Sequence, residues 1–172
     1  MNQLINFFWT ILGFAAVLVY WVSAGLSAWF YIFIVLSIIP AFLSQKIFAG
    51  LQLSNSTELY ERLGVRFIRK FVQQGDIANR LVRKNDPAYQ VIRIKANPEG
   101  YLKTIMMYER YHFICLIFFL LTSGMALVEG RYIQALIIMI SNMFYNFYPI
   151  LLQQYNRIRI LRSSKKFKNP IS

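Results

Sequence analysis

The chain has 172 residues, of which 57% are hydrophobic and 17% aromatic, and 19 Lys and Arg against seven Asp and Glu give a net charge of +12. Residues 1–45, 111–128 and 132–156 contain no charged side chain. A water-soluble domain of this size cannot bury 45 consecutive uncharged residues of this kind. The composition therefore excludes an ordinary soluble fold and predicts an all-α integral membrane protein.

Four apolar segments are predicted to cross the membrane, since the hydrocarbon core takes about 20 helical residues to span. Small residues near Gly25 divide the first uncharged stretch into a hairpin. The predicted spans are residues 4–22, 26–43, 111–128, and a fourth from Tyr132 past Pro149. The chain thus divides into a transmembrane hairpin (1–45), a basic segment (46–110), a second transmembrane hairpin (111–156) and a basic tail (157–172).

The positions of Lys and Arg predict the orientation. Residues 46–110 carry twelve of them and the tail after Asn156 carries six, whereas the loop between the third and fourth spans has only Glu129 and Arg131. The positive-inside rule therefore predicts a multi-pass cell-membrane protein with both termini and residues 46–110 in the cytosol. Attraction to anionic membrane lipid accounts for the remaining basic excess, so no nucleic-acid partner is expected. The oligomeric state is not predicted.

The basic segment begins with an amphipathic pattern. In residues 58–74 the apolar side chains recur at helical spacing, which predicts one amphipathic helix lying in the interface plane against the membrane or the bundle; they are Tyr60, Leu63, Phe67, Ile68 and Phe71. A second short helix is predicted over residues 76–83. Pro98 after Asn97 predicts a helix start, and that helix can continue through the third span.

Glu109 and His112 are the first candidate site residues. They are three residues apart and so share a helix face. A carboxylate that orients a histidine is a common general-base arrangement, and His112 is the only histidine in the chain. The alternative is an interfacial pair that anchors the helix and has no chemical role.

The fourth span carries a stripe of residues at helical spacing that is polar except for its proline: Asn142, Asn146, Pro149, Gln153 and Asn156. Amides facing lipid would be unfavourable, so this stripe must face other helices or water. Its cytosolic half lies at the depth of Glu109 and His112, and we expect one cavity there. The alternative is hydrogen bonding between helices, which we favour for Asn142.

Several cations could hold phosphate groups on the cytosolic side, because guanidinium suits them well. Arg157 and Arg159 follow Tyr155 and Asn156, and the amphipathic segment adds Arg66, Arg69 and Lys70. The alternative is a lipid-facing or solvated surface. One histidine and one cysteine, Cys115, cannot build a usual zinc site or a bis-histidine haem, so no metal or bound cofactor is expected.

Two motifs resemble a known family. Glu109-Arg110-Tyr111-His112 begins a span, and Asn146 precedes Gln153-Gln154-Tyr155-Asn156-Arg157-Ile158-Arg159. This combination is similar to the glycosyl-4,4'-diaponeurosporenoate acyltransferases, small bacterial membrane proteins of staphyloxanthin-type carotenoid synthesis. The resemblance implies transfer of a fatty acyl chain onto a sugar hydroxyl of a glycosylated carotenoid acid.

The leading hypothesis is therefore a membrane-embedded acyltransferase with acyl-CoA as co-substrate and a lipid-soluble acceptor. His112 would act as base, Glu109 would orient it, and Asn146, with Asn156, would stabilise the oxyanion. The donor would be bound by the polar and basic residues of the cytosolic side: Gln153, Tyr155, Asn156, Arg157, Arg159, Arg66, Arg69 and Lys70. The alternatives are a non-enzymatic helical bundle that binds lipid or a protein partner, and a small transport subunit.

Overall fold

The structure is a computed structural model that describes residues 2–69 and 98–168. The described residues form helices and connecting loops without a strand, in the order α1 (Asn2–Ala24), α2 (Ala28–Ser37), α3 (Ile39–Phe42), α4 (Gln45–Gly50), α5 (Thr57–Arg62), α6 (Val65–Ile68), α8 (Pro98–Val128), α9 (Tyr132–Asn142), the π-helix η1 (Met143–Phe147) and α10 (Tyr148–Lys168). Helix α8 confirms the prediction of one helix that begins at Pro98 and continues to Val128.

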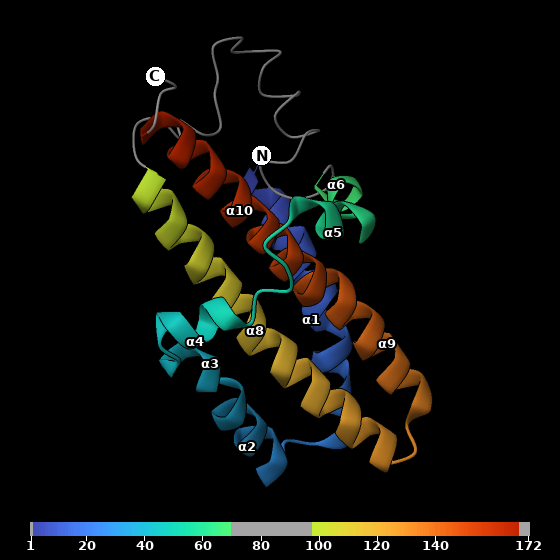
Figure 1. The fold of residues 1–172 in the computed structure, drawn as a ribbon. Coiled ribbons are helices and arrows are strands. Elements are labelled where there is room, and N and C mark those ends of the chain that lie inside the picture. Colours follow the sequence, from blue (N-terminus) through green and yellow to red (C-terminus); the bar gives the residue numbers. More distant parts are fainter. Residues whose placement is uncertain (1, 70–97, 169–172) are drawn as a thin grey trace.

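Helix α8 lies at the centre of the bundle and contacts α2, α9, η1 and α10, while α1 packs mainly against α9 and η1. The apolar core between these helices includes Val17, Phe119 and Ile138, each almost fully buried. Inside this core, the indole of Trp21 donates a hydrogen bond to the Thr122 hydroxyl over 3.2 Å. Figure 1 shows the start of α1, the end of α10 and helices α5 and α6 at one end of the bundle.

Three of the helical segments are long and apolar enough to cross a membrane: Phe7–Ala24, Glu99–Val128 and Tyr132–Ser163. The second predicted span is a shorter apolar segment, Ala28–Phe42, in which α2 and α3 meet at Ile38 just before Pro40. Fifteen residues at about 1.5 Å each reach only about 22 Å, less than the hydrocarbon thickness. The structure supports three spanning helices by length, and the count of four stays a prediction.

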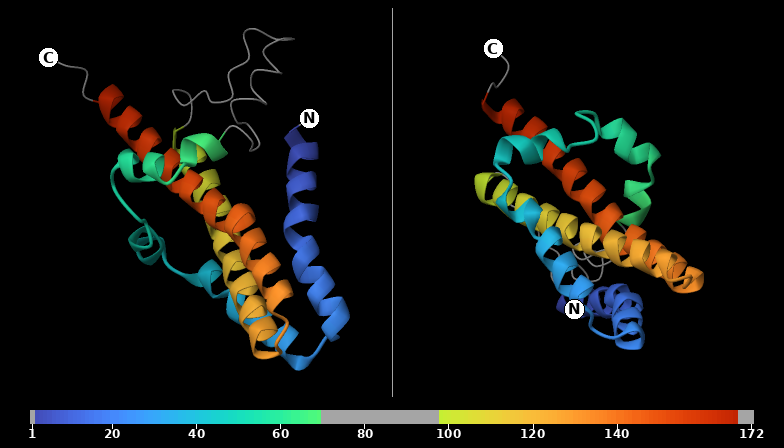
Figure 2. Two further views of the ribbon diagram at one scale, coloured as in Figure 1. Left: turned by 90° about the vertical axis from the view of Figure 1, so that its right-hand side faces the viewer. Right: turned by 90° about the horizontal axis from the view of Figure 1, so that it is seen from below.

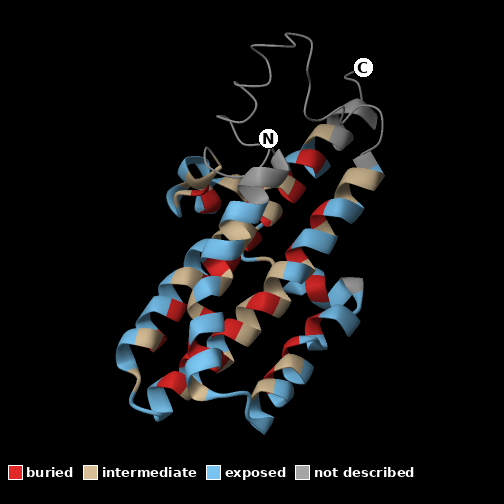
Figure 3. Cartoon of the chain, turned by 180° about the vertical axis from the view of Figure 1, so that it is seen from behind, coloured by how far each residue is buried: buried red, intermediate tan, exposed pale blue. Residues whose placement is uncertain are grey.

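Large apolar side chains cover the outside of the bundle. Val22, Phe42 and Val128 are each more than 80% exposed, and Figure 3 shows buried residues on the faces of the long helices that meet. Apolar side chains on the outer surface suit a hydrocarbon solvent. In such a solvent, the association of the helices depends on close packing and on hydrogen bonds between them.

The amphipathic segment differs from its prediction. Instead of one helix over 58–74, two short helices flank Gly64, whose φ of +81° lies in the left-handed region and breaks the helix. Tyr60 and Val65 are buried in a cluster with α10 residues, whereas Phe67 is 60% exposed. The buried face thus packs on the bundle and is centred on Tyr60 and Val65. Phe71, Asn97 and the helix predicted over 76–83 lie outside the described residues.

Helix α4 and the end of α3 are fastened to α8 by one arginine. Arg110 donates hydrogen bonds to the carbonyl oxygens of Ala41, at 3.0 Å, and Leu43, at 2.9 Å. Its guanidinium also lies 5.3 Å from the ring centroid of Phe48. A cation at the last carbonyls of a helix complements the helix dipole, so Arg110 determines where the first hairpin ends against α8.

Candidate active site

The π-helix η1 lies where the polar stripe of the fourth segment turns inward. A π-helix adds one residue to a helical turn and changes which side chains face the core, and such turns are frequent at functional sites. Here the amide N–H of Tyr148 donates to the carbonyl of Met143, five residues earlier. The consecutive residues Tyr145 and Asn146 are both buried, at 8% and 0% exposure.

Asn146 and His112 meet across the interface between η1 and α8. The Nδ1 atom of His112 lies 3.4 Å from Oδ1 of Asn146. Asn146 Nδ2 donates to Asn142 Oδ1 over 2.8 Å, and Asn142 Nδ2 donates to the backbone carbonyl of Leu116 over 3.2 Å. We call His112, Asn146 and Asn142 the His112 chain. Asn146 and His112 are thus in contact, whereas the pocket described below is lined by neither of them, and the expected cavity around them stays a prediction.

The end of the His112 chain determines its hydrogen-bond direction. The Leu116 carbonyl can only accept, so Asn142 must present its nitrogen there and its oxygen to Asn146. Asn146 then presents its nitrogen to Asn142 and its oxygen to His112. A hydrogen bond across the 3.4 Å contact with Asn146 Oδ1 therefore requires a hydrogen on His112 Nδ1. In a neutral imidazole this leaves Nε2 unprotonated and able to accept a proton.

Aromatic rings surround His112. The Tyr145 ring meets the imidazole edge to face at 5.8 Å between centroids, and the Tyr145 hydroxyl lies 3.1 Å from the hydroxyls of both Tyr111 and Thr10. Helix α1 approaches this ring so closely that a Cβ at Gly13 would lie 2.5 Å from it. Glycine at this position therefore allows α1 to close over Tyr145.

Glu109 belongs to a different cluster, which corrects the predicted pairing with His112. It is fully buried, and its Oε2 accepts a 2.8 Å hydrogen bond from Arg157 Nη1 in a buried ion pair. Its Oε1 accepts from Gln154 Nε2, also at 2.8 Å. A carboxylate inside the bundle needs a cation and hydrogen-bond donors, and α10 supplies both. Glu109 therefore faces α10 while His112 faces η1.

Gln154 and Arg157 connect Glu109 to the loop before α5. Arg157 donates through Nε and Nη2 to Gln52 Oε1, at 3.1 and 2.8 Å. Gln154 Oε1 accepts from the amide of Leu53 and from the Tyr60 hydroxyl. We call Glu109, Arg157, Gln154, Gln52 and Tyr60 the Glu109 cluster. Burial raises the pKa of Tyr60, which keeps its hydroxyl protonated as a donor.

This cluster contains residues that the sequence analysis missed or placed elsewhere. Arg157 was predicted to hold donor phosphates, but it is only 7% exposed and its guanidinium is occupied by Glu109 and Gln52. Gln154 was named only as part of the family motif, without a predicted role, and Gln52 was not singled out. The sequence did contain a signal for Gln154, because this amide side chain directly follows Gln153 of the predicted stripe in an otherwise apolar stretch. Its partner on the loop could not be predicted.

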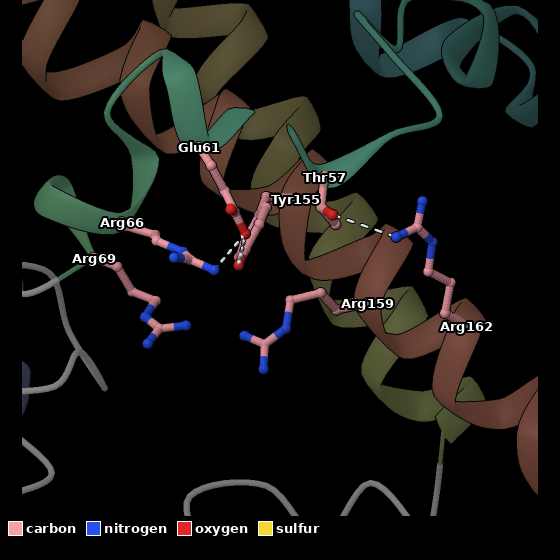
Figure 4. Close-up of a pocket in the computed structure, with 7 residues that line it drawn as sticks. All are labelled: Thr57, Glu61, Arg66, Arg69, Tyr155, Arg159 and Arg162. Atoms are coloured by element: carbon pink, nitrogen blue, oxygen red, sulfur yellow. Dashed lines mark hydrogen bonds and ion pairs between the residues drawn. The ribbon is translucent and has the colours of Figure 1, made fainter. Parts of the chain in front are cut away.

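An open pocket of about 450 Å³ lies between α5, α6 and α10. Four of the predicted donor-binding residues line it: Arg66, Arg69, Tyr155 and Arg159. The other lining residues are Thr57, Glu61 and Arg162. Figure 4 shows Arg66, Arg69 and Arg159 directing their guanidiniums toward the same space, with Arg162 to one side beside Thr57. Arginines on three sides suit an anionic ligand.

The remaining predicted residues lie outside these groups or outside the described chain. Gln153 and Asn156 are partly buried on α10 and do not line the pocket. Lys70 is not among the described residues. In the part of the chain that the structure describes, no three His, Cys, Asp or Glu side chains gather in a way that could hold a metal ion.

The sequence matches the family model for glycosyl-4,4'-diaponeurosporenoate acyltransferase over residues 44–166. This match covers more than two thirds of the chain and includes the His112 chain, the Glu109 cluster and the arginine pocket. Neither a curated protein nor a solved structure gave a match.

Proposed function

Because the chain belongs to the glycosyl-4,4'-diaponeurosporenoate acyltransferase family, we propose that it is a membrane-embedded enzyme that transfers a fatty acyl group from a cytosolic-side donor to a hydroxyl of a lipid-soluble acceptor. The acceptor that the family name suggests is a glycosylated carotenoid acid. The observation that carries this proposal is the His112 chain, which leaves Nε2 of the half-buried His112 imidazole as the proposed base.

In the proposed reaction, His112 Nε2 takes the proton from the acceptor hydroxyl as its oxygen attacks the carbonyl carbon of the donor thioester. The tetrahedral intermediate then collapses, the carbon–sulfur bond breaks, and the proton passes from His112 to the leaving thiolate. The products are the ester and a free thiol. General-base catalysis of this kind contributes about 100- to 10,000-fold to the rate.

Asn146 has a different proposed role from the one expected of it. Its side chain is fully buried, and Nδ2 uses one of its two hydrogens to donate to Asn142 Oδ1 over 2.8 Å, so Asn146 is poorly placed to donate to an oxyanion. We propose that Asn146 is a positioning residue that holds the imidazole in the tautomer with Nδ1 protonated. An amide partner suits this role because it holds the ring without adding a buried charge.

The proposed membrane arrangement has multiple passes, with both termini and residues 46–110 in the cytosol. It is supported by the basic excess of residues 46–110 and 157–172 and by the common end of the bundle shared by the start of α1, α5, α6 and the end of α10 (Figure 2). Single cysteines placed at Thr57 and Gly130 in a Cys115→Ser background should be labelled from opposite sides of the membrane. Labelling from the same side would overturn this arrangement.

The decisive test of function compares wild-type protein with His112→Asn. The asparagine nitrogen can take the place of Nδ1 and keep the hydrogen bond to Asn146, but asparagine has no basic group at the position of Nε2. Purified proteins in lipid nanodiscs would receive acyl-CoA and a glycosylated carotenoid acid, and ester formation would be followed by mass spectrometry. Full turnover by a folded His112→Asn variant would refute the mechanism, and no turnover by wild type would favour a non-enzymatic bundle.

A further inference from the structure

The pocket between α5, α6 and α10 has a charge that is only partly neutralised from within. Four arginines and one glutamate line it, which gives a net charge of +3. Glu61 is engaged by Arg66 at 2.9 Å and accepts a hydrogen bond from the Tyr155 hydroxyl at 3.1 Å. No carboxylate of the described residues forms an ion pair with Arg159, whose guanidinium lies over the Tyr155 ring at 5.5 Å. The pocket therefore favours a ligand that carries several negative charges.

Its distance from the His112 chain limits what that ligand can be. Tyr155, Arg159 and Arg162 follow Asn146 by 9, 13 and 16 residues on the same helical segment. At about 1.5 Å per residue, these positions lie roughly 14 to 24 Å from the proposed reaction centre, toward the cytosolic end. A donor that reaches both places must hold its anionic part far from its reactive carbonyl.

We propose that this pocket binds the phosphates of a coenzyme A thioester, the acyl donor of the proposed reaction. The inference rests on the proposed function of His112. A CoA thioester carries several phosphates around its adenosine and joins them to the thioester through the long pantetheine arm. In a glycerophospholipid, by contrast, the ester carbonyl is only a few bonds from the phosphate, so it could not occupy both places at once.

Arg69 and Arg159 are the arginines to change, because both line the pocket, one directly after α6 and the other on α10, whereas Arg66 is the arginine that pairs with Glu61. The control is Arg62→Gln, which removes the same charge from an exposed position on α5 outside the pocket. Binding of CoA to each protein in nanodiscs of neutral lipid would be measured by calorimetry. We expect Arg69→Gln and Arg159→Gln each to weaken CoA binding about tenfold or more, with no change for Arg62→Gln.

A truncated donor gives a second, kinetic test. Acyl-pantetheine keeps the thioester and the arm but lacks the nucleotide and its phosphates. Wild type should use acyl-CoA with a lower KM than acyl-pantetheine, and this difference should disappear in the double variant Arg69→Gln/Arg159→Gln.

The outcomes separate this inference from the proposed function. His112→Asn should lose turnover but bind CoA as wild type does. Retained turnover in this variant would refute the role of His112 as base, and the pocket assignment would then be judged by the CoA binding measurements. Unchanged CoA affinity in the double variant would overturn the pocket assignment even if His112 proves essential. Two other results would also overturn it. In the first, the double variant binds CoA as wild type does and loses only its binding to anionic vesicles, which indicates a lipid-surface site. In the second, wild type uses acyl carrier protein as the donor and CoA does not inhibit the reaction.

Discussion

Glu109 and His112 lie one turn apart on α8, yet their side chains belong to polar clusters of different kinds. In the Glu109 cluster both carboxylate oxygens, the amide of Gln154 and the guanidinium of Arg157 are hydrogen-bonded within the protein. In the His112 chain each amide is also engaged, but the direction of its hydrogen bonds leaves Nε2 as a base.

The comparison shows that a buried polar group is not by itself evidence of a reactive site. The Glu109 cluster joins α8, α10 and the loop before α5, and each of its strong hydrogen-bonding groups is satisfied, as stability requires. A reactive site needs one group whose capacity is not used by the fold. Four predictions test this division, from the largest expected effect to the smallest.

Replacement of the proposed base should have the largest effect. His112→Asn should lower turnover by about 100- to 10,000-fold, because it removes the basic nitrogen while keeping a donor toward Asn146. The thermal unfolding midpoint in detergent, followed by intrinsic fluorescence, should stay near that of wild type. A large loss of stability with proportionate loss of activity would assign His112 to the structural side of the comparison.

Removal of the Glu109 carboxylate should act on stability instead. Glu109→Ala leaves the Arg157 guanidinium buried without its partner, which should lower the free energy of unfolding by about 3–5 kcal/mol. The double change Glu109→Leu/Arg157→Met should recover much of this loss, since it removes both buried charges. Denaturation in SDS–detergent mixtures measures both. A stable Glu109→Ala protein with no turnover would restore Glu109 to the catalytic group.

Removal of the positioning amide should have an intermediate effect that depends on His112. Asn146→Ala should lower turnover by roughly 10- to 100-fold, which is the range seen when a group that hydrogen-bonds to a metal-ligating histidine and orients its ring is removed. In a His112→Asn background, Asn146→Ala should lower turnover no further. The effects of Glu109→Gln and Asn146→Ala on turnover should instead be additive. Additivity of Asn146→Ala with His112→Asn would show that Asn146 acts on the substrate directly.

Loss of one hydroxyl in the Glu109 cluster should have the smallest effect. Tyr60→Phe removes the donor to Gln154 and should destabilise the protein by about 1–2 kcal/mol with little change in turnover. Burial raises the pKa of Tyr60, so the folded state disfavours the phenolate and wild-type stability should fall as pH rises above the ordinary tyrosine pKa of about 10. Melting at pH 8 and pH 11 should show a smaller decline in Tyr60→Phe. An equal decline would remove Tyr60 as its source.

Local patterns in the sequence were sufficient for the elements whose structure depends on neighbouring residues. The uncharged stretches predicted the long apolar helices, and Pro98 predicted the start of α8. The polar stripe required Asn142 and Asn146 to face inward, because amides facing hydrocarbon would lack partners. Burial and depth also predicted that Asn146 lies at the level of His112, but not the contact between them.

Tertiary contacts decided what local spacing could not. A helix face spans several directions, so the three-residue spacing of Glu109 and His112 did not determine that one faces α10 and the other η1. The π-helix changes the register of Asn146 by an amount that no residue pattern announces. Arg157 and Arg159 are two residues apart and look alike in sequence, yet opposite sides of α10 make one a buried partner of Glu109 and the other a pocket residue. The sequence by itself thus determined which side chains must avoid lipid, because that depends on each residue's own polarity, whereas only the packed helices decided which partner each of them meets.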